Sequence, residues 1–203
     1  MDEIILIGAG GHARSCIDVV ECENHFKIAG LVGKNESIGE NTVGYPVIGV
    51  DDDLEGLRQR FTYALVTVGQ IKSSETRTKI YELLKSLEFQ LPIITSPSAY
   101  VSKHARIGEG SIVMHSAIAN SNAHIGVNCI INNKALVEHD AKIGDHCHIA
   151  TGAIVNGGVQ VGEGSFIGSG AVARQGISIG NQCVIGAGCA VRHNVSDKQI
   201  VKN

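Results

Sequence analysis

The chain has 203 residues and a formal net charge of −3 at pH 7, with no basic block and no polybasic amphipathic stretch. This composition argues against nucleic acid and membrane surfaces as partners, and no apolar run approaches the roughly 18 residues of a membrane span. The start MDEIILIGAGG has neither the charge nor the apolar length of a signal peptide, so we expect a cytoplasmic protein.

The first part of the chain, residues 1–95, alternates strand-like and helix-like segments. The predicted elements are a strand at 3–7, a glycine turn at 8–11, a helix at 13–22, strands at 28–32 and 64–68, and a helix at 74–87. The apolar face of the last helix is predicted to hold Ile80, Leu83, Leu84 and Leu87. Strand, turn, helix and strand form a βαβ pattern, so we expect a small Rossmann-like α/β domain with a parallel sheet.

The second part, residues 96–203, repeats with a period of six after the boundary Ser96-Pro97-Ser98. Every sixth residue from Val101 to Val191 is aliphatic, sixteen positions in succession without a change of phase. This repeat predicts a left-handed parallel β-helix, in which three hexads form one triangular coil. An all-β sandwich is the alternative, but its strands vary in length and do not keep such a period.

Two further positions of the hexad are regular. Glycine often follows the aliphatic residue, where we expect a corner that a Cβ atom would crowd. A small residue often stands two positions before the next aliphatic one, and four of the six cysteines occupy this slot: Cys129, Cys147, Cys183 and Cys189. Because no CxxC pair occurs, we interpret these cysteines as buried small apolar residues without a metal or redox role.

Four motifs carry a resemblance to a known family: GAGGH at 8–12, GYPVIG at 44–49, INN at 131–133 and VEHD at 137–140. Their order, over nearly the whole chain, resembles the sialic acid O-acetyltransferase family of hexapeptide-repeat acyltransferases. That family includes bacterial N-acetyltransferases acting on UDP-linked 4-amino sugars. The resemblance implies a homotrimer in polysaccharide biosynthesis that uses acetyl-CoA, with active sites between adjacent β-helices.

His139 is the candidate catalytic base. It is the third residue of its hexad, so its side chain should project outward near a corner, between the acids Glu138 and Asp140. Either carboxylate could accept the imidazole N–H and raise the basicity of the other nitrogen. By themselves, three outward polar residues are also what a solvated edge would show. The resemblance implies that His139 is the general base and Glu138 its orienting carboxylate.

The resemblance also implies roles for residues elsewhere. His148 would lie near the acyl donor, and the backbone N–H of Gly157, eighteen residues after His139, would contact the thioester oxygen. The implied acceptor contacts are Gly11 and His12 at the diphosphate, Gly69 in the same cleft, and Asn132. From the residues alone, the glycine turn at 8–11 could bind phosphate or be purely structural.

Two departures from the family leave the acceptor open. Relatives often carry an Asp that contacts uracil where Gly33 or Lys34 stands, so the nucleotide could differ or be missing. The lack of an acid after the second strand also argues against a dinucleotide site. The sequence ends Val201-Lys202-Asn203 without the usual Gly-x-Pro-Ala-Lys tail. We expect either that the chain is a shortened form of the family or that CoA binding relies on the coils and the neighbouring subunit alone.

The leading hypothesis is N-acetylation of a nucleotide-linked 4-amino sugar. O-acetylation of sialic acid or a related nonulosonic acid is the close alternative, and a non-catalytic sugar-nucleotide-binding repeat protein is the alternative from another class. A zinc carbonic anhydrase of the γ class shares the β-helix, but the expected histidine spacing is missing and the α/β domain would be unexplained. We therefore expect no metal.

Overall fold

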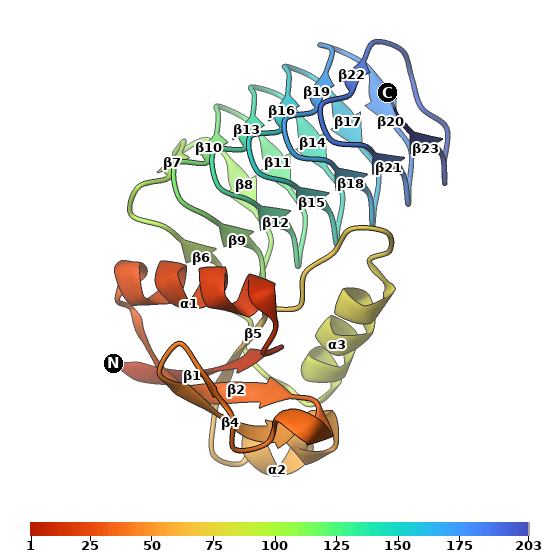
Figure 1. Cartoon of the computed structure of the whole chain (residues 1–203). Coiled ribbons are helices and arrows are strands. Elements are labelled where there is room, and N and C mark those ends of the chain that lie inside the picture. The colour runs from red at the N-terminus through yellow and green to blue at the C-terminus, as the bar shows by residue number, and fades with distance from the viewer. Residues whose placement is uncertain (203) are drawn as a thin grey trace.

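The computed structural model describes residues 1–202, in which an α/β domain carries a β-helix on one side (Figure 1). The α/β sheet has the order β3-β4-β2-β1-β5 and is parallel except for the edge strand β3. Its strands are β1 (Asp2–Ile7), β2 (Phe26–Gly33), β3 (Asn41–Thr42), β4 (Tyr45–Val50) and β5 (Tyr63–Val66). The helical elements are α1 (Gly11–Glu23), η1 (Asn35–Ser37), η2 (Asp51–Asp53), α2 (Leu54–Arg58) and α3 (Glu75–Ser86).

The parallel sheet, α1 and α3 are confirmed, whereas β3, β4 and α2 lie where the pattern gave no element. The predicted apolar face of α3 is wrong at Leu83, which is 39% exposed. Arg77 and Tyr81 take the buried positions beside Ile80 and Leu84 instead. None of the helices within residues 1–202 has the length and apolar character that a membrane crossing requires.

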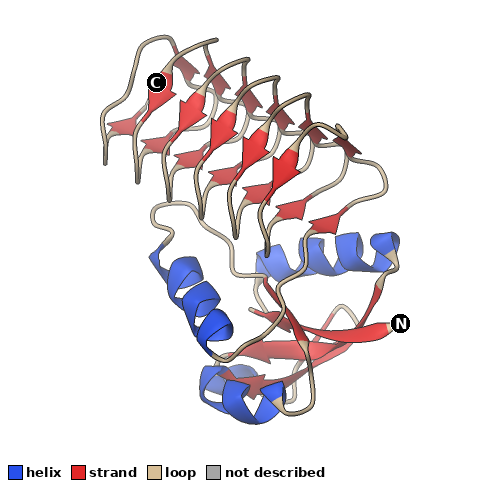
Figure 2. Ribbon diagram, turned by 180° about the vertical axis from the view of Figure 1, so that it is seen from behind, coloured by secondary structure: helices blue, strands red, loops and turns tan. Residues whose placement is uncertain are grey.

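The β-helix consists of two-residue strands stacked into three flat sheets, which Figure 2 shows from behind. The docked face contains β6 (Ile94–Thr95), β9 (Ile112–Val113), β12 (Ile130–Ile131), β15 (His148–Ile149), β18 (Phe166–Ile167), β21 (Val184–Ile185) and β23 (Ile200–Val201). The apolar face contains β7 (Tyr100–Val101), β10 (Ile118–Ala119), β13 (Leu136–Val137), β16 (Ile154–Val155), β19 (Val172–Ala173) and β22 (Ala190–Val191). The polar face contains β8 (Arg106–Ile107), β11 (His124–Ile125), β14 (Lys142–Ile143), β17 (Gln160–Val161) and β20 (Ser178–Ile179).

The hexad prediction is confirmed position by position. The second residue of each strand points inward, and all sixteen aliphatic residues are buried except Val101 and Ile107 in the first coil, which are partly buried. The four predicted cysteines fill interior slots, where Cys147 Sγ, for example, lies 3.1 Å from the carbonyl oxygen of Gly162. Strand β6 already pairs with β9, so the coil begins two residues before the predicted boundary at 95/96.

The corners of the β-helix restrict the residue type at two positions of each hexad, and the sequence analysis predicted only one of them. A Cβ atom on Gly144 would lie 2.7 Å from the backbone nitrogen of Glu163 in the next coil, so this position needs glycine for close stacking. The second requirement is conformational. Every sixth residue from Gly110 to Gly188 has positive φ, and the non-glycine residues that accept it include Asn122, Asn128 and Asp140.

The domains share a hydrophobic core. Helix α1 buries Ala13, Cys16, Ile17, Val19 and Val20 at helical spacing. The same cluster contains sheet residues such as Leu6 and Leu31 and the docked-face residues Ile94, Ile112, Met114 and Ile130. Helix α1 therefore lies between the sheet and the first coils, and the α/β domain has a fixed position on the docked face.

The corner glycines give a test of the stacking. We expect Gly144→Ala to destabilise the protein by about 1–3 kcal/mol, because its Cβ overlaps the next coil. Gly56→Ala is the matched control: Gly56 lies in α2 with open space around its Cα, so alanine should be neutral or stabilise by up to about 1 kcal/mol. Chemical denaturation measures both changes, and equal stability of the two variants would contradict the stacking account.

Candidate active site

A pocket of about 790 Å³ opens where the α/β domain meets the docked face. It is formed by the glycine turn after β1, the ends of β2 and β5, and the side chain of His148, which points outward from β15. Gly11, His12, Gly69 and His148 all line it, so the structure brings four predicted site residues into one cavity. Its volume is in the range of small-molecule binding pockets.

The N-terminus of α1 faces this pocket with free backbone N–H groups. The N-cap Gly10 makes no side-chain cap hydrogen bond, and the first turn has no acidic residue. A Cβ on Gly10 or Gly11 would meet nothing within 4 Å, so the space in front of these N–H groups is open. Because a helix N-terminus carries partial positive charge, this end of α1 suits an anion.

His148 and Asn132 form one hydrogen-bonded unit. His148 Nδ1 lies 2.7 Å from the carbonyl oxygen of Gln70, which can only accept, so Nδ1 carries the proton. His148 Nε2 then accepts from Asn132 Nδ2 at 3.0 Å, and the ring packs edge-on against Phe166. Burial lowers the pKa of His148 to about 4. His148 is therefore a neutral, fixed imidazole with both nitrogens engaged.

His12 is also neutral. Burial lowers its pKa to about 3, with further lowering by the charge of Arg77 and by His148, whose ring centroid is 6.2 Å away. Its Nε2 lies 3.3 Å from Cys16 Sγ. An anion at this end of the pocket would thus meet helix N–H groups rather than a cationic imidazole.

A second group of predicted residues lies at the corner between the apolar and polar faces. Here His139 packs against the next coil at Gly157, where a Cβ would lie 2.6 Å from His139 Nε2. Asp140 Oδ2 accepts a hydrogen bond from His139 Nδ1 at 2.8 Å and raises the pKa of His139 above its usual value. The pKa of Asp140 is lowered, first by the hydrogen bond from Asn122 and then by that from His139.

Glu138 differs from its predicted contact. Its Oε2 accepts the backbone N–H of His139 at 3.0 Å and the side-chain amide of Asn120 at 2.8 Å, while Asp140 takes the imidazole. The left-handed backbone of Asp140, with φ of 59°, belongs to the corner series and starts the turn that brings its carboxylate to the ring. The carboxylate that contacts the imidazole of His139 is therefore that of Asp140 and not that of Glu138.

One chain does not bring the two groups together. His139 projects from the corner opposite the docked face, whereas His148 and Asn132 belong to the docked face and the corner that follows it. In Figure 1 the α/β domain lies below the first coils, with α1 beside β6. The pocket is on this docked side, because His148 of β15 lines it. His139 and the pocket therefore lie on opposite sides of the coil.

Arg77 is a residue that sequence reasoning missed. Its side chain is 1% exposed and donates to the carbonyl oxygens of Val66 at 3.1 Å, Val68 at 2.6 Å and Asn128 at 3.0 Å, and to Asn128 Oδ1 at 2.7 Å. Burial lowers its pKa to about 10, so it stays charged at neutral pH. Arg77 ties the end of β5, next to Gly69, to a β-helix corner. Its place three residues before Ile80, on the apolar period of α3, was the available sign.

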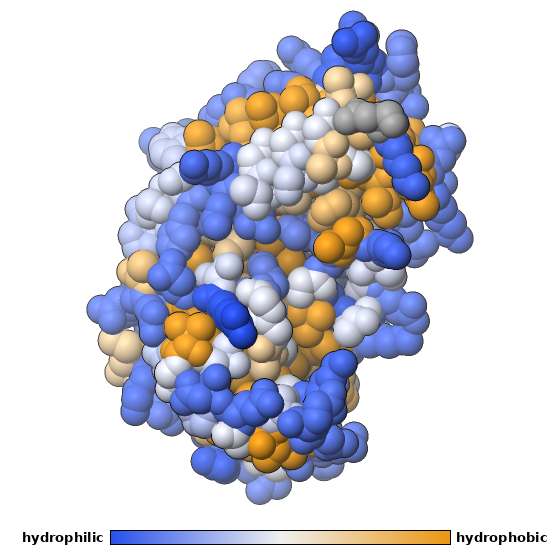
Figure 3. Space-filling view, viewed as in Figure 1, coloured by the Kyte–Doolittle hydropathy of each residue, from blue (hydrophilic) through white to orange (hydrophobic). Residues whose placement is uncertain are grey.

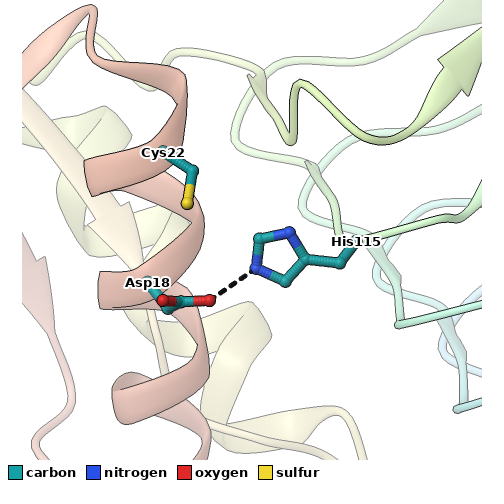
Figure 4. A group of neighbouring side chains, drawn as sticks. All are labelled: Asp18, Cys22 and His115. Carbon is teal, nitrogen blue, oxygen red and sulfur yellow. Dashed lines mark hydrogen bonds and ion pairs between the residues drawn. The ribbon is translucent and has the colours of Figure 1, made fainter.

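A second bridge between the domains involves Asp18, Cys22 and His115 (Figure 4). His115 Nε2 lies 2.7 Å from Asp18 Oδ2, and its Nδ1 lies 2.7 Å from Ser96 Oγ. Within residues 1–202 these three side chains form the one group with three potential metal-ligand atoms in mutual reach. Both imidazole nitrogens are hydrogen bonded, so the group functions as a polar contact between α1 and the first coil.

The buried arginine gives a second prediction. We expect Arg77→Met to lose at least about 3 kcal/mol of stability, because several buried carbonyl groups lose their donor at about 1–3 kcal/mol each. Lys79→Met, on the exposed side of the same helix, should change stability by less than about 1 kcal/mol. Denaturant titration compares them, and similar midpoints for the two variants would show that Arg77 does not fix the domain junction.

Comparisons with known proteins agree with this architecture. Residues 3–84 match the family model of the PglD N-terminal domain, and residues 140–175 match the bacterial transferase hexapeptide (six repeats) model. A comparison with curated protein sequences found no match.

Several solved structures are similar over nearly the whole chain. PerB from Caulobacter crescentus, in complex with CoA and GDP-perosamine, is 32% identical with a TM-score of 0.91, covering 98% of this chain and 93% of that one. The acetyltransferase domain of PglB from Neisseria gonorrhoeae, with acetyl coenzyme A, is 31% identical with a TM-score of 0.89, covering 98% and 94%. WeeI from Acinetobacter baumannii, at 24% identity and a TM-score of 0.86 over 100% and 98%, shares the fold. Both domains and these relatives together show that the chain belongs to the acetyl-CoA-dependent sugar N-acetyltransferases of the hexapeptide-repeat family.

Proposed function

We propose that this enzyme transfers the acetyl group of acetyl-CoA to the amine of a nucleotide-linked amino sugar, with His139 as general base. The observation that carries the proposal is the pocket in which the uncapped N-terminus of α1 and the fixed His148 face the same cavity. PerB, which is 32% identical to this chain, is a protein solved with CoA and GDP-perosamine together.

The acceptor's diphosphate fits the N–H groups at the start of α1, including that of Gly11. The neutral His12 leaves this binding to backbone dipoles. The sugar would then extend toward Gly69 and His148, where Asn132 holds the imidazole. Charge on the bound acceptor is thus met by a preorganised helix end.

The chemistry needs one base and one oxyanion donor. In the proposed step the sugar amine attacks the thioester carbonyl while His139 Nε2 accepts the amine proton; the tetrahedral oxyanion receives the N–H of Gly157. Collapse breaks the C–S bond, and the proton passes from His139 to the CoA thiolate, giving the acetamide and CoA. Asp140 holds the Nδ1 proton throughout, so Nε2 is the basic nitrogen.

Within one chain, the proposed base His139 lies far from the pocket that would hold the acceptor. A second copy of the chain is therefore needed to complete the proposed active site. The apolar face presents Tyr100, Ile118, Leu136, Ile154, Val172 and Ala190 outward. Of these, Ile118 and Val172 are each 37% exposed, and hydrophobic residues are visible along that edge in Figure 3. We propose that three copies pack through this face, so that the His139 corner of one copy reaches the pocket of the next.

The acyl donor fits the same corner above His139. Arg174 and Arg192 follow Asn156 at intervals of eighteen residues and line a shallow groove together with His193. Successive coils are about 4.8 Å apart, so the arginines form a cationic column leading away from Gly157. Such a column suits the phosphates of CoA and would supply binding energy independently of a C-terminal tail.

An acceptor panel tests the reaction. CoA release would be measured with GDP-, UDP- and dTDP-linked amino sugars, their hydroxyl analogues and free sialic acids. We expect turnover of a nucleotide-linked amine. Turnover of free sialic acids alone would favour the O-acetylation alternative and overturn the proposal.

The base has its own prediction. With the best acceptor, His139→Ala should lower kcat by about 10²–10⁴-fold, the usual contribution of a general base. His139 must be neutral to accept a proton, so kcat/KM falls as pH drops through its pKa. Asp140 raises that pKa, and Asp140→Asn should therefore move the acidic limb to lower pH.

Glu138→Gln is the matched control for the pH profile. Its carboxylate bonds the backbone rather than the ring, so we expect a smaller shift than for Asp140→Asn. Full turnover by His139→Ala, or a larger shift for Glu138→Gln, would contradict these roles.

A further inference from the structure

The charged side chains of the pocket are all at one end. Among its lining residues only Lys34, Glu36 and Asp51 carry a charge, and they follow the ends of β2 and β4. The opposite end, after β5 and around β15, is lined by neutral residues such as Thr67, Gln70 and His148. The pocket therefore has a charged end and a neutral end, with the N-terminus of α1 between them.

The sheet order gives these ends different roles. Strands β2 and β4 lie on one side of β1, and β5 lies on the other. A diphosphate at the start of α1, directly after β1, must send the nucleoside to one side and the sugar to the other. The sugar belongs at the neutral end, because His148 and the docked face are there. The nucleobase therefore lies at the charged end, beside Lys34 and Asp51.

Position 33 cannot supply an acid to the base. A Cβ on Gly33 would lie 2.5 Å from Ser37 Oγ and 3.2 Å from Val47 Cγ1, and Ser37 Oγ is held there by its hydrogen bond to the carbonyl oxygen of Lys34. Any side chain at position 33 would therefore displace Ser37. The carboxylates that line this end of the pocket are those of Glu36 and Asp51.

Of these two carboxylates, that of Asp51 lies directly at a strand end of the sheet. It is the first residue after β4, and the adjacent turn is closed by Asp53, whose Oδ2 accepts the N–H of Val50 at 2.9 Å. The carboxylate of Asp51 makes no hydrogen bond or ion pair within the described part of the chain, while its backbone carbonyl accepts the N–H of Leu54. Burial, and the neighbouring charge of Asp52, raise the pKa of Asp51. The side chain of Asp51 is exposed at the pocket lining, so its carboxylate is free to accept a pair of N–H donors from a ligand.

The donor and acceptor pattern of the bases discriminates among nucleotides. Guanine presents two adjacent donors, N1–H and N2–H, next to the acceptor O6. A carboxylate accepts both donors, while an ammonium group donates to O6 or N7. Uracil and thymine present one N–H between two carbonyl oxygens, so the second carboxylate oxygen would face an acceptor. Adenine offers no pair of adjacent donors to a carboxylate.

We propose that the pocket selects guanine, with Asp51 accepting from N1–H and N2–H and Lys34 donating to the O6 or N7 side, so that the acceptor is a GDP-linked amino sugar. This inference rests on the proposed function, because it assumes that the pocket holds the acceptor nucleotide.

Binding of free nucleotides to the full chain tests the inference without catalysis. Calorimetric titration with GDP, UDP, dTDP and ADP should give a Kd for GDP about 10- to 100-fold below the others. Asp51→Asn should remove most of that preference, because the amide presents an N–H₂ group to N2–H. The matched control is Asp52→Asn, which changes the same charge on the next residue, outside the pocket lining, and should keep the preference.

The outcomes separate the two proposals. Binding of UDP or dTDP at least as tightly as GDP would overturn guanine selection and leave the acetyl transfer to a nucleotide sugar intact. An unchanged preference in both Asp51→Asn and Asp52→Asn would also overturn the assignment of Asp51. If no nucleotide binds and a free amino sugar is acetylated, the proposed acceptor class fails and guanine selection fails with it. Circular dichroism of each variant confirms that binding is compared between folded proteins.

Discussion

The stacking of one aliphatic side chain per hexad inside the coil is the constraint on which the rest of the structure depends. It fixes an eighteen-residue register, so residues that differ by eighteen lie directly above one another. That register brings His139 against Gly157, Asn120 against Glu138, and Asn122 against Asp140. The corner chemistry is therefore a consequence of interior packing, because no loop insertion disturbs the alignment of outward side chains.

A different interaction positions the pocket. Arg77 is a buried cation without a carboxylate partner, and carbonyl oxygens of both domains solvate it. Its Nε has no partner within the described residues, but both terminal nitrogens are hydrogen bonded to groups of both domains, which restricts movement between β5 and the β-helix. The same junction holds Gln70, whose carbonyl fixes the tautomer of His148. The pocket thus depends on contacts between the two domains, whereas the corner at His139 depends on the regular stacking of coils within the β-helix.

This difference explains what the sequence could predict. The six-residue repeat can be read directly from the amino-acid sequence. The coils, the interior cysteines and the nearness of His139 to Gly157 could therefore be predicted from it. The docking of the two domains cannot be read from the sequence, so the nearness of His12 to His148 was not predicted and the role of Arg77 was missed. Leu83 was assigned to the core because it is apolar and next to Leu84, whereas Arg77 was left out because it is charged, although it lies on the buried period of the helix. Asp140 and Glu138 could not be separated, because the choice depends on the left-handed backbone at Asp140.

The central claim is that two copies share each active site, and complementation tests it most directly. His139→Ala and His148→Ala would be co-expressed with different affinity tags, and mixed oligomers isolated through both tags. The account predicts that each variant alone is nearly inactive and that mixed oligomers regain activity, because some sites then combine an intact His139 with an intact pocket from another copy. Mixed oligomers as inactive as either parent would contradict it and place both functions within a single chain.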